Sequence, residues 1–93
     1  MWQVLEHSRL DKQLDRLPRE VLKRYEKWKD VVTISGPRGL RMIKGVHDES
    51  LRGPLQAYRS SRLNLQYRVI YQVITEKSEV RMLRITAHDY RGE

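Results

Sequence analysis

The stretch QYRVIYQVI, from Gln66 to Ile74, decides the fold that we expect for this chain. Its side chains fall into two alternating rows, and this period of two is typical of a β-strand with one buried face. The first row holds Val69, Tyr71 and Val73, which suit a core. The second row holds Arg68, Ile70, Gln72 and Ile74. The strand is therefore expected to present Arg68 on the face that the core leaves open.

Two further segments with the same period flank this strand, Leu55 to Leu63 and Val80 to His88. Short connections near residues 63–65 and 76–78 favour an antiparallel meander of the three strands. In the last strand we expect Leu83, Ile85 and Ala87 to face the core, and the outward row to be Met82, Arg84, Thr86, His88 and, beyond it, Tyr90. In the first strand, an inward Tyr58 leaves Arg59 on the open side, and the direction of Arg62 stays unresolved.

The preceding half of the chain predicts a strand and two helices. Residues 2–7 are apolar-rich and form the first strand. Apolar residues then recur at helical spacing in two stripes, which predicts two helices that join near Pro18 and end at Ser35-Gly36-Pro37. The stripes are Leu10, Leu14 and Leu17, and Val21, Tyr25, Trp28 and Val32. Residues 36–54 form a long connection, within which 40–43 could be a short helix or strand.

These elements give an α+β fold of the order β-α-α-β-β-β, with an antiparallel sheet covered on one face by a helical hairpin. A chain of 93 residues has the length of one domain, so we assign residues 1–93 to a single domain. Cysteine is absent, and no segment is long and apolar enough to span a membrane. We therefore expect a cytoplasmic protein. The sequence contains no metal or cofactor motif.

The charge of the chain indicates a polyanionic partner. Nineteen Lys and Arg residues oppose twelve Asp and Glu residues, so the net charge is +7 and the pI is about 10.1. Between Pro37 and Arg68, seven basic residues face only Asp48 and Glu49, so the surplus lies at the start of the expected meander. Such a surface attracts nucleic acids, although it also suits an acidic protein.

The open face of the sheet is expected to gather Arg59, Arg68, Arg84, His88 and Tyr90 from three neighbouring strands. RNA cleavage without a metal requires side chains of these types. One group accepts the proton of a 2′-hydroxyl, another protonates the departing 5′-oxygen, and cations stabilise the charge on phosphorus. Arginine suits phosphate because its planar fork contacts two oxygens, and histidine suits proton donation because it titrates near neutrality.

Four segments of this sequence resemble the RelE/HigB/ParE toxin superfamily. They are Leu51-Arg52-Gly53, Tyr58-Arg59-Ser60-Ser61, Gln66-Tyr67-Arg68-Val69-Ile70-Tyr71 and Ala87-His88-Asp89-Tyr90-Arg91. The resemblance is close in the second half of the chain, and the expected order of elements extends it to the first half. It implies a toxin that pairs with a cognate antitoxin protein, and a RelE-like fold.

The resemblance also implies an activity, the cleavage of messenger RNA on the ribosome, which inhibits translation. The 2′-hydroxyl would attack the adjacent phosphate and leave a 2′,3′-cyclic phosphate, with no metal. Arg68 would stabilise the phosphorus centre, while His88, as first candidate for the general acid, Asp89 and Tyr90 would supply acid–base help and base stacking. The implied phosphate contacts are Arg52, Arg59, Arg62, Arg84 and Arg91.

The general base stays unassigned, because Glu49 is near in sequence but its register is not fixed. In some ribonucleases of the superfamily, the first strand of the meander carries a lysine two residues after its first cation. In this chain that cation is Arg59, and Ser61 occupies the position of the lysine. Two alternatives remain. The ParE branch shares the scaffold but inhibits DNA gyrase, and a plain RNA-binding module would bind without cleaving.

Overall fold

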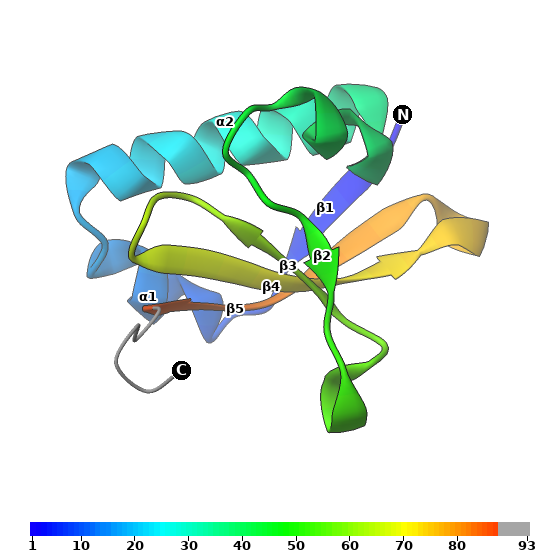
Figure 1. Cartoon of the computed structure of the whole chain (residues 1–93). Helices are drawn as coiled ribbons and strands as arrows, with labels where there is room; N and C mark the ends of the chain where they lie inside the picture. The colour runs from blue at the N-terminus through cyan, green and yellow to red at the C-terminus, as the bar shows by residue number, and fades with distance from the viewer. Residues whose placement is uncertain (88–93) are drawn as a thin grey trace.

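The structure is a computed structural model that describes residues 1–87 (Figure 1). Two α-helices, three 3₁₀ helices and five strands occur in these residues. In chain order they are β1 (Gln3–Glu6), α1 (Leu10–Asp15), α2 (Arg19–Ser35), η1 (Pro37–Met42), β2 (Glu49–Ser50), η2 (Gly53–Leu55), β3 (Arg59–Arg62), β4 (Tyr67–Ile74), η3 (Thr75–Lys77) and β5 (Glu79–Ala87). The α+β class and the predicted order of β-α-α-β-β-β are confirmed, with one additional short strand, β2, after the helices. None of the helices in this part of the chain is long and apolar enough to cross a membrane.

The five strands form one sheet in the order β1-β5-β4-β3-β2. The expected antiparallel meander of β3, β4 and β5 is confirmed. The sheet as a whole is not purely antiparallel, because β1 runs parallel to β5, with Gln3 opposite Glu79. β1 and β5 are not consecutive in the chain, and the helices and strands between them allow the two strands to run in the same direction. The two-residue strand β2 adds an edge that the sequence did not reveal.

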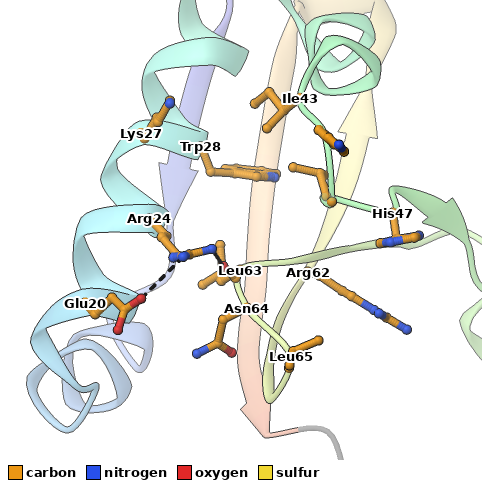
Figure 2. A pocket seen from close by; sticks show the side chains of 13 residues that line it. Glu20, Arg24, Lys27, Trp28, Ile43, His47, Arg62, Leu63, Asn64 and Leu65 are labelled. Carbon is orange, nitrogen blue, oxygen red and sulfur yellow. Dashed lines mark hydrogen bonds and ion pairs between the residues drawn. The ribbon is translucent and has the colours of Figure 1, made fainter.

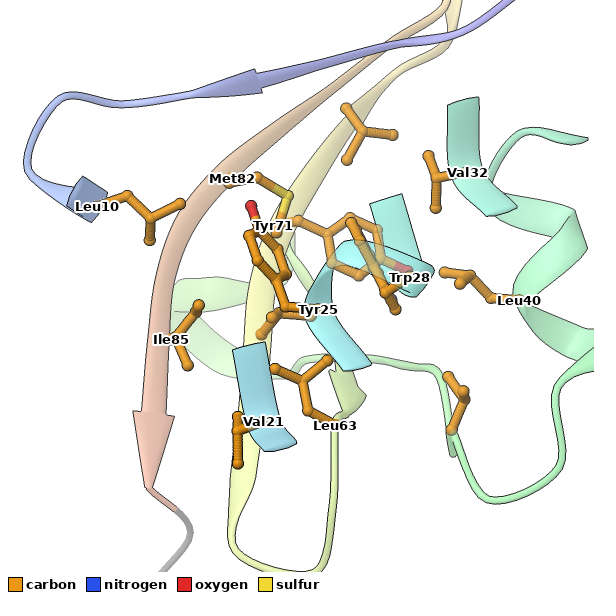
Figure 3. Close-up of a cluster of buried hydrophobic side chains, with 13 residues drawn as sticks. Leu10, Val21, Tyr25, Trp28, Val32, Leu40, Leu63, Tyr71, Met82 and Ile85 are labelled. Atoms are coloured by element: carbon orange, nitrogen blue, oxygen red, sulfur yellow. The ribbon is translucent and has the colours of Figure 1, made fainter. Parts of the chain in front are cut away.

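Helix α2 lies across one face of the sheet, and α1 lies near β5 (Figure 1). The stripe on α2 is buried as expected, and Trp28 packs edge-on against Tyr71 of β4, with ring centroids 5.0 Å apart. Leu10 of α1 joins the same core, and the Ile85 amide donates to the Gln13 side chain at 2.9 Å. Figure 3 shows the side chains of both helices meeting those of the sheet.

A β-bulge changes which residues of β5 face the core. Ile70 lies opposite Arg84, but the next residue, Tyr71, lies opposite Met82, so Leu83 is the extra residue. The expected outward position of Met82 is therefore wrong, because the bulge shifts the alternation by one residue and buries this side chain to 3% exposure. Leu83 is only half-buried, whereas Ile85 faces the core as expected.

The long connection is more ordered than its glycine content suggested. Residues 40–43 do not form a strand, since Leu40 is buried within η1. Gly36 ends α2 with φ +74°, and a Cβ at this position would lie 2.6 Å from the Trp2 indole nitrogen. The strand expected at Leu55–Leu63 covers only Arg59–Arg62, because η2 and its turn occupy the preceding residues.

The carboxylate of Asp48 joins the end of this connection to the sheet. Its Oδ2 accepts hydrogen bonds from Arg59 Nε and Nη2 at 2.9 and 2.8 Å. Its Oδ1 accepts from Ser61 Oγ at 2.6 Å and from the Tyr71 hydroxyl. The Asp48 side chain is only 8% exposed, so these donors replace its hydration. The segment that leads into β2 is thereby fixed against β3 and β4.

Arg59 belongs to this cluster, and its expected position on the open face is wrong. In the register of the sheet Arg59 lies opposite Tyr71, which faces the helices. Tyr58 precedes the strand, so the alternation of β3 cannot be set from it. Burial alone would lower the pKa of Arg59, but the hydrogen bonds to Asp48 and its charge raise that pKa above the ordinary value.

Burial, together with the hydrogen bond to Asp48 and the charge of that carboxylate, raises the pKa of Tyr71 above its usual 10.0. The phenol therefore stays protonated and continues to donate at neutral pH. A raised pKa in the folded state stabilises the fold fully below the unfolded pKa, and this contribution is lost as the pH rises toward the folded pKa.

We predict that Gly36→Ala lowers the free energy of unfolding by about 2 kcal/mol or more, because it adds both a left-handed alanine and a clash with Trp2. Gly45→Ala is the matched control. Gly45 has φ +87° and open space around it, so this variant should lose only about 1 kcal/mol. Urea unfolding of both variants measures the difference, and equal losses would contradict the contact with Trp2.

We expect Asp48→Ala to destabilise the protein by about 3–5 kcal/mol, since it leaves the Arg59 guanidinium and the Tyr71 hydroxyl without their acceptor. Glu49→Ala, at the adjacent and exposed position, should cost about 0.5 kcal/mol. Urea unfolding at neutral pH tests the pair. A loss below about 1 kcal/mol for Asp48→Ala would show that the cluster does not organise the fold.

A third prediction concerns alkaline pH. The melting temperature of the wild type should fall more steeply between about pH 9 and 11 than that of Tyr71→Phe, because only the wild type must keep this phenol protonated. Thermal unfolding followed by circular dichroism at several pH values measures both slopes. Parallel slopes would mean that Tyr71 does not contribute to the pH dependence.

Candidate nucleic-acid interface

The register of the sheet brings two rows of side chains onto the face opposite the α2-covered core. Residues directly opposite each other in paired strands share a face, so they form rows that run across the strands. One row crosses four strands and the next crosses three. The first row is Glu49, Ser60, Ile70 and Arg84, and the second is Arg62, Arg68 and Thr86. We call these two rows the open face, although Ser60 and Ile70 within it are themselves buried, at 2% and 6% exposure. Arg68 and Arg84 lie on it as the sequence predicted.

Arg68 is the most firmly oriented side chain of the open face. Its Nε and Nη2 donate to Ser60 Oγ at 3.2 and 2.6 Å, and Nη2 also donates to Glu49 Oε1 at 2.9 Å. The Arg68 side chain is 12% exposed, whereas that of Glu49 is 61% exposed. The guanidinium is thus fixed in one orientation before any ligand arrives. Pre-orientation of this kind is what an anion-stabilising group requires.

Arg62 and Arg84 surround Arg68 on the same face. Arg62 lies directly opposite Arg68 in the register, and Arg84 lies on β5 in the adjacent row and is exposed. Like charges on directly opposed residues destabilise a sheet unless an anion or a carboxylate offsets them. Within residues 1–87, Glu49 is the carboxylate that pairs with Arg68. The surface therefore has the charge distribution of a phosphate-binding site.

The unresolved direction of Arg62 is settled by the register, which places this side chain beside Arg68 rather than with Arg59. Its Nε is buried and has no hydrogen-bond partner in the part of the chain that the structure describes. Arg52 is exposed and precedes η2 in the loop between β2 and β3, so it is not a member of either row. No group of three or more His, Asp or Glu side chains among residues 1–87 is arranged to hold a metal ion.

The remaining predicted site residues, His88, Asp89, Tyr90 and Arg91, lie outside the described residues. They follow Ala87, the last residue of β5, which lies opposite Tyr67. The sequence analysis missed Ser60 as a member of the site, and it named Glu49 only as a possible base whose register was not fixed. A strand of two residues shows no alternation, so the register of Glu49 could not be read. Ser60 would have been assigned to the open face only if the alternation of side chains along β3 had been read correctly.

No protein-family model matches the chain, and no curated protein matches its sequence. Solved structures do match its fold. A chain of the archaeal RelE–RelB complex from Pyrococcus horikoshii OT3 is similar, with a TM-score of 0.75 and 23% identity over 96% of this chain and 97% of that one.

Two further structures show the same similarity. A chain of the toxin–antitoxin complex RelBE2 from Mycobacterium tuberculosis has a TM-score of 0.72 and 22% identity, covering 94% of this chain and 98% of its own length. A chain of the YoeB–YefM complex from Staphylococcus aureus has a TM-score of 0.70 and 14% identity, with coverage of 96% and 99%. The resemblance seen in the sequence is thus confirmed at the level of the fold, and the chain has the fold of the RelE- and YoeB-type toxins.

Proposed function

We propose that this protein is the toxin of a type II toxin–antitoxin pair and that it cleaves messenger RNA on the ribosome. The observation that carries the proposal is the orientation of Arg68 by Ser60 and Glu49 on a cationic sheet face. The similarity of the fold to RelE- and YoeB-type structures supports it. A purely scaffolding sheet surface would not need an arginine that is fixed in place and surrounded by two others.

In the proposed reaction the 2′-hydroxyl oxygen of one nucleotide attacks the adjacent phosphorus, and the bond from phosphorus to the 5′-oxygen breaks. A base removes the hydroxyl proton and an acid protonates the departing oxygen, which leaves a 2′,3′-cyclic phosphate and a free 5′-hydroxyl. Arg68 stabilises the additional negative charge on the phosphate oxygens as the bond forms. No metal ion is needed in this scheme.

Glu49 is our candidate for the general base. Its carboxylate lies 2.9 Å from Arg68 Nη2, so it is close to any phosphate bound there, and its side chain is exposed enough to meet a ribose. His88 is the candidate general acid, with Asp89 and Tyr90 in supporting roles. Phosphates of the flanking nucleotides would contact Arg52, Arg62, Arg84 and Arg91. Arg59 is not part of this set, because its guanidinium donates to Asp48.

The proposal includes a protein partner and a place of action. The RelE–RelB, RelBE2 and YoeB–YefM structures are complexes of toxin–antitoxin systems. We therefore propose a cognate antitoxin for this chain, acidic where it contacts the cationic surface, and action in the cytoplasm on translating ribosomes.

The test is primer extension on a messenger RNA translated in a cell-free extract. Wild-type protein should produce cuts within the translated region, and Arg68→Ala should reduce the cleavage rate about 100-fold or more, as expected for loss of a group that stabilises the transition state. Arg68→Lys should also be impaired, since lysine lacks the planar fork. Glu49→Gln and His88→Ala should each lower the rate by a similar factor.

Arg81→Ala is the matched control. Arg81 lies opposite Gln72 on the same face, two rows away from Arg68, and pairs with Glu79, so its loss should change cleavage by less than about threefold. Intact transcripts with folded wild-type protein would contradict the nuclease. If DNA supercoiling is instead inhibited and the inhibition survives Arg68→Ala, the chain is a gyrase inhibitor. Salt-sensitive RNA binding without cuts would identify a plain binding module.

A further inference from the structure

His47 has a strained backbone at the edge of the candidate site. Its φ is +46°, in the left-handed region, and among residues 1–87 Ser78 is the only other non-glycine residue with a positive φ. A conformation of this kind costs free energy and persists where the surrounding structure holds it, which happens most often at functional sites. The next residue, Asp48, accepts hydrogen bonds from side chains of β3 and β4. These bonds hold the backbone at His47 in place.

His47 is also an inserted residue. Glu49 lies opposite Ser60, so continued pairing would bring His47 opposite Arg62 and bond the Arg62 amide to the His47 carbonyl. The Arg62 amide instead donates to the carbonyl of Val46 at 2.6 Å. One extra residue in an edge segment is the mark of a β-bulge, and bulges beside active sites re-aim a side chain. The insertion therefore changes the direction of the His47 side chain.

The His47 side chain lies beside the open face. It is exposed, and together with Arg62 it lines a groove between α2 and two segments, residues 43–47 and 62–65. In Figure 2 the side chains of His47 and Arg62 both extend away from α2. Arg62 lies directly opposite Arg68, and Glu49 follows His47 by two residues. His47 thus extends the row of Arg62 and Arg68 by one more segment.

The imidazole of His47 is an exposed flat ring beside a cationic surface. Every Trp and Tyr among residues 1–87 is buried or half-buried. The other histidine in this part of the chain, His7, lies at the opposite edge of the sheet, directly after β1. Proteins that bind single-stranded RNA combine cations along its backbone with flat rings, histidine included, on which bases stack. Of the rings that the structure describes, His47 is therefore the one available to a base of RNA bound at the open face.

We propose that His47 stacks on the base of a nucleotide next to the scissile phosphate, and that this contact influences which sites are cut. Neighbouring strands lie about 5 Å apart, so the backbone of His47 is roughly 10 Å from that of Arg68. This separation suits a flanking nucleotide rather than the reacting phosphate. The inference rests on the proposed nuclease function for its substrate, and it gives His47 no part in bond breaking. Because the backbone at His47 is already fixed, little backbone freedom is lost when RNA binds.

Single-turnover cleavage of messenger RNA on programmed ribosomes tests the proposal. His47→Gly should raise the protein concentration for half-maximal rate about tenfold and shift the distribution of cut sites, while the saturating rate stays within about threefold of wild type. Arg68→Ala should instead lower the saturating rate. Glycine adopts a positive φ without strain, so the urea midpoint of His47→Gly should not fall below that of wild type. His7→Ala is the matched control and should leave both kinetic values within about twofold of wild type. A larger fall in the saturating rate of His47→Gly would overturn the proposal, because His47 would then act in the chemical step.

A second measurement does not require cleavage. It follows by anisotropy the binding of a fluorescein-labelled 2′-O-methyl RNA of about six nucleotides, in which the attacking hydroxyl is blocked. His47→Gly should weaken this binding about tenfold, whereas an oligonucleotide of the same length without bases should bind both proteins within about twofold of each other. Equal binding of the 2′-O-methyl RNA to both proteins would overturn the contact, and a tenfold difference with the base-free chain would overturn stacking in favour of a phosphate contact. If wild type cuts nothing and the 2′-O-methyl RNA still distinguishes the two proteins, the nuclease proposal fails while the contact of His47 with RNA stands.

Discussion

The buried carboxylate of Asp48 accepts hydrogen bonds from three side chains on two strands, and the arrangement of both sheet faces depends on it. It fixes the end of the long connection against β3 and β4, on the side that the helices cover. Alternation along β2 then directs the next residue, Glu49, to the opposite face, where it meets Arg68. Two adjacent acidic residues thus serve opposite faces of one sheet. One of them stabilises the fold, and the other lies in the candidate site.

Much of the fold could be read from local periodicity. The buried stripe of α2 followed from helical spacing, and its end followed from Ser35-Gly36-Pro37, where the structure gives Gly36 a φ of +74°. Strand β4 followed from its alternation. Two features escaped because they are not local. The bulge at Leu83 exchanges the faces of the residues before it, which buried Met82. The parallel pairing of β1 with β5 joins segments that are far apart in the sequence, so no short pattern encodes it.

The cations of the candidate site could be predicted from the sequence, but the side chains that pair with them could not. Arg68 and Arg84 were placed correctly because each lies in a strand of eight or nine residues, where the phase is well defined. Strand β3 has only four residues. Because its alternation was set from Tyr58, Arg59 was assigned to the open face, which in the structure carries Arg62 instead. Ser60 was missed and the register of Glu49 was left open for the same reason, since very short strands leave alternation undefined. His88 and the three residues after it stay predictions.

The parallel contact between β1 and β5 also governs the order in which the molecule can form. The first strand of the chain obtains its sheet partner from the last, so this contact closes a loop of more than seventy residues, and contacts of such long range slow folding. The ring of Trp28 is likewise covered only after Tyr71 of β4 packs against it. A nascent chain therefore cannot complete its central strands until β5 has left the ribosome. Synthesis of the polypeptide and completion of the sheet face that carries Arg68 and Arg84 are therefore separated in time.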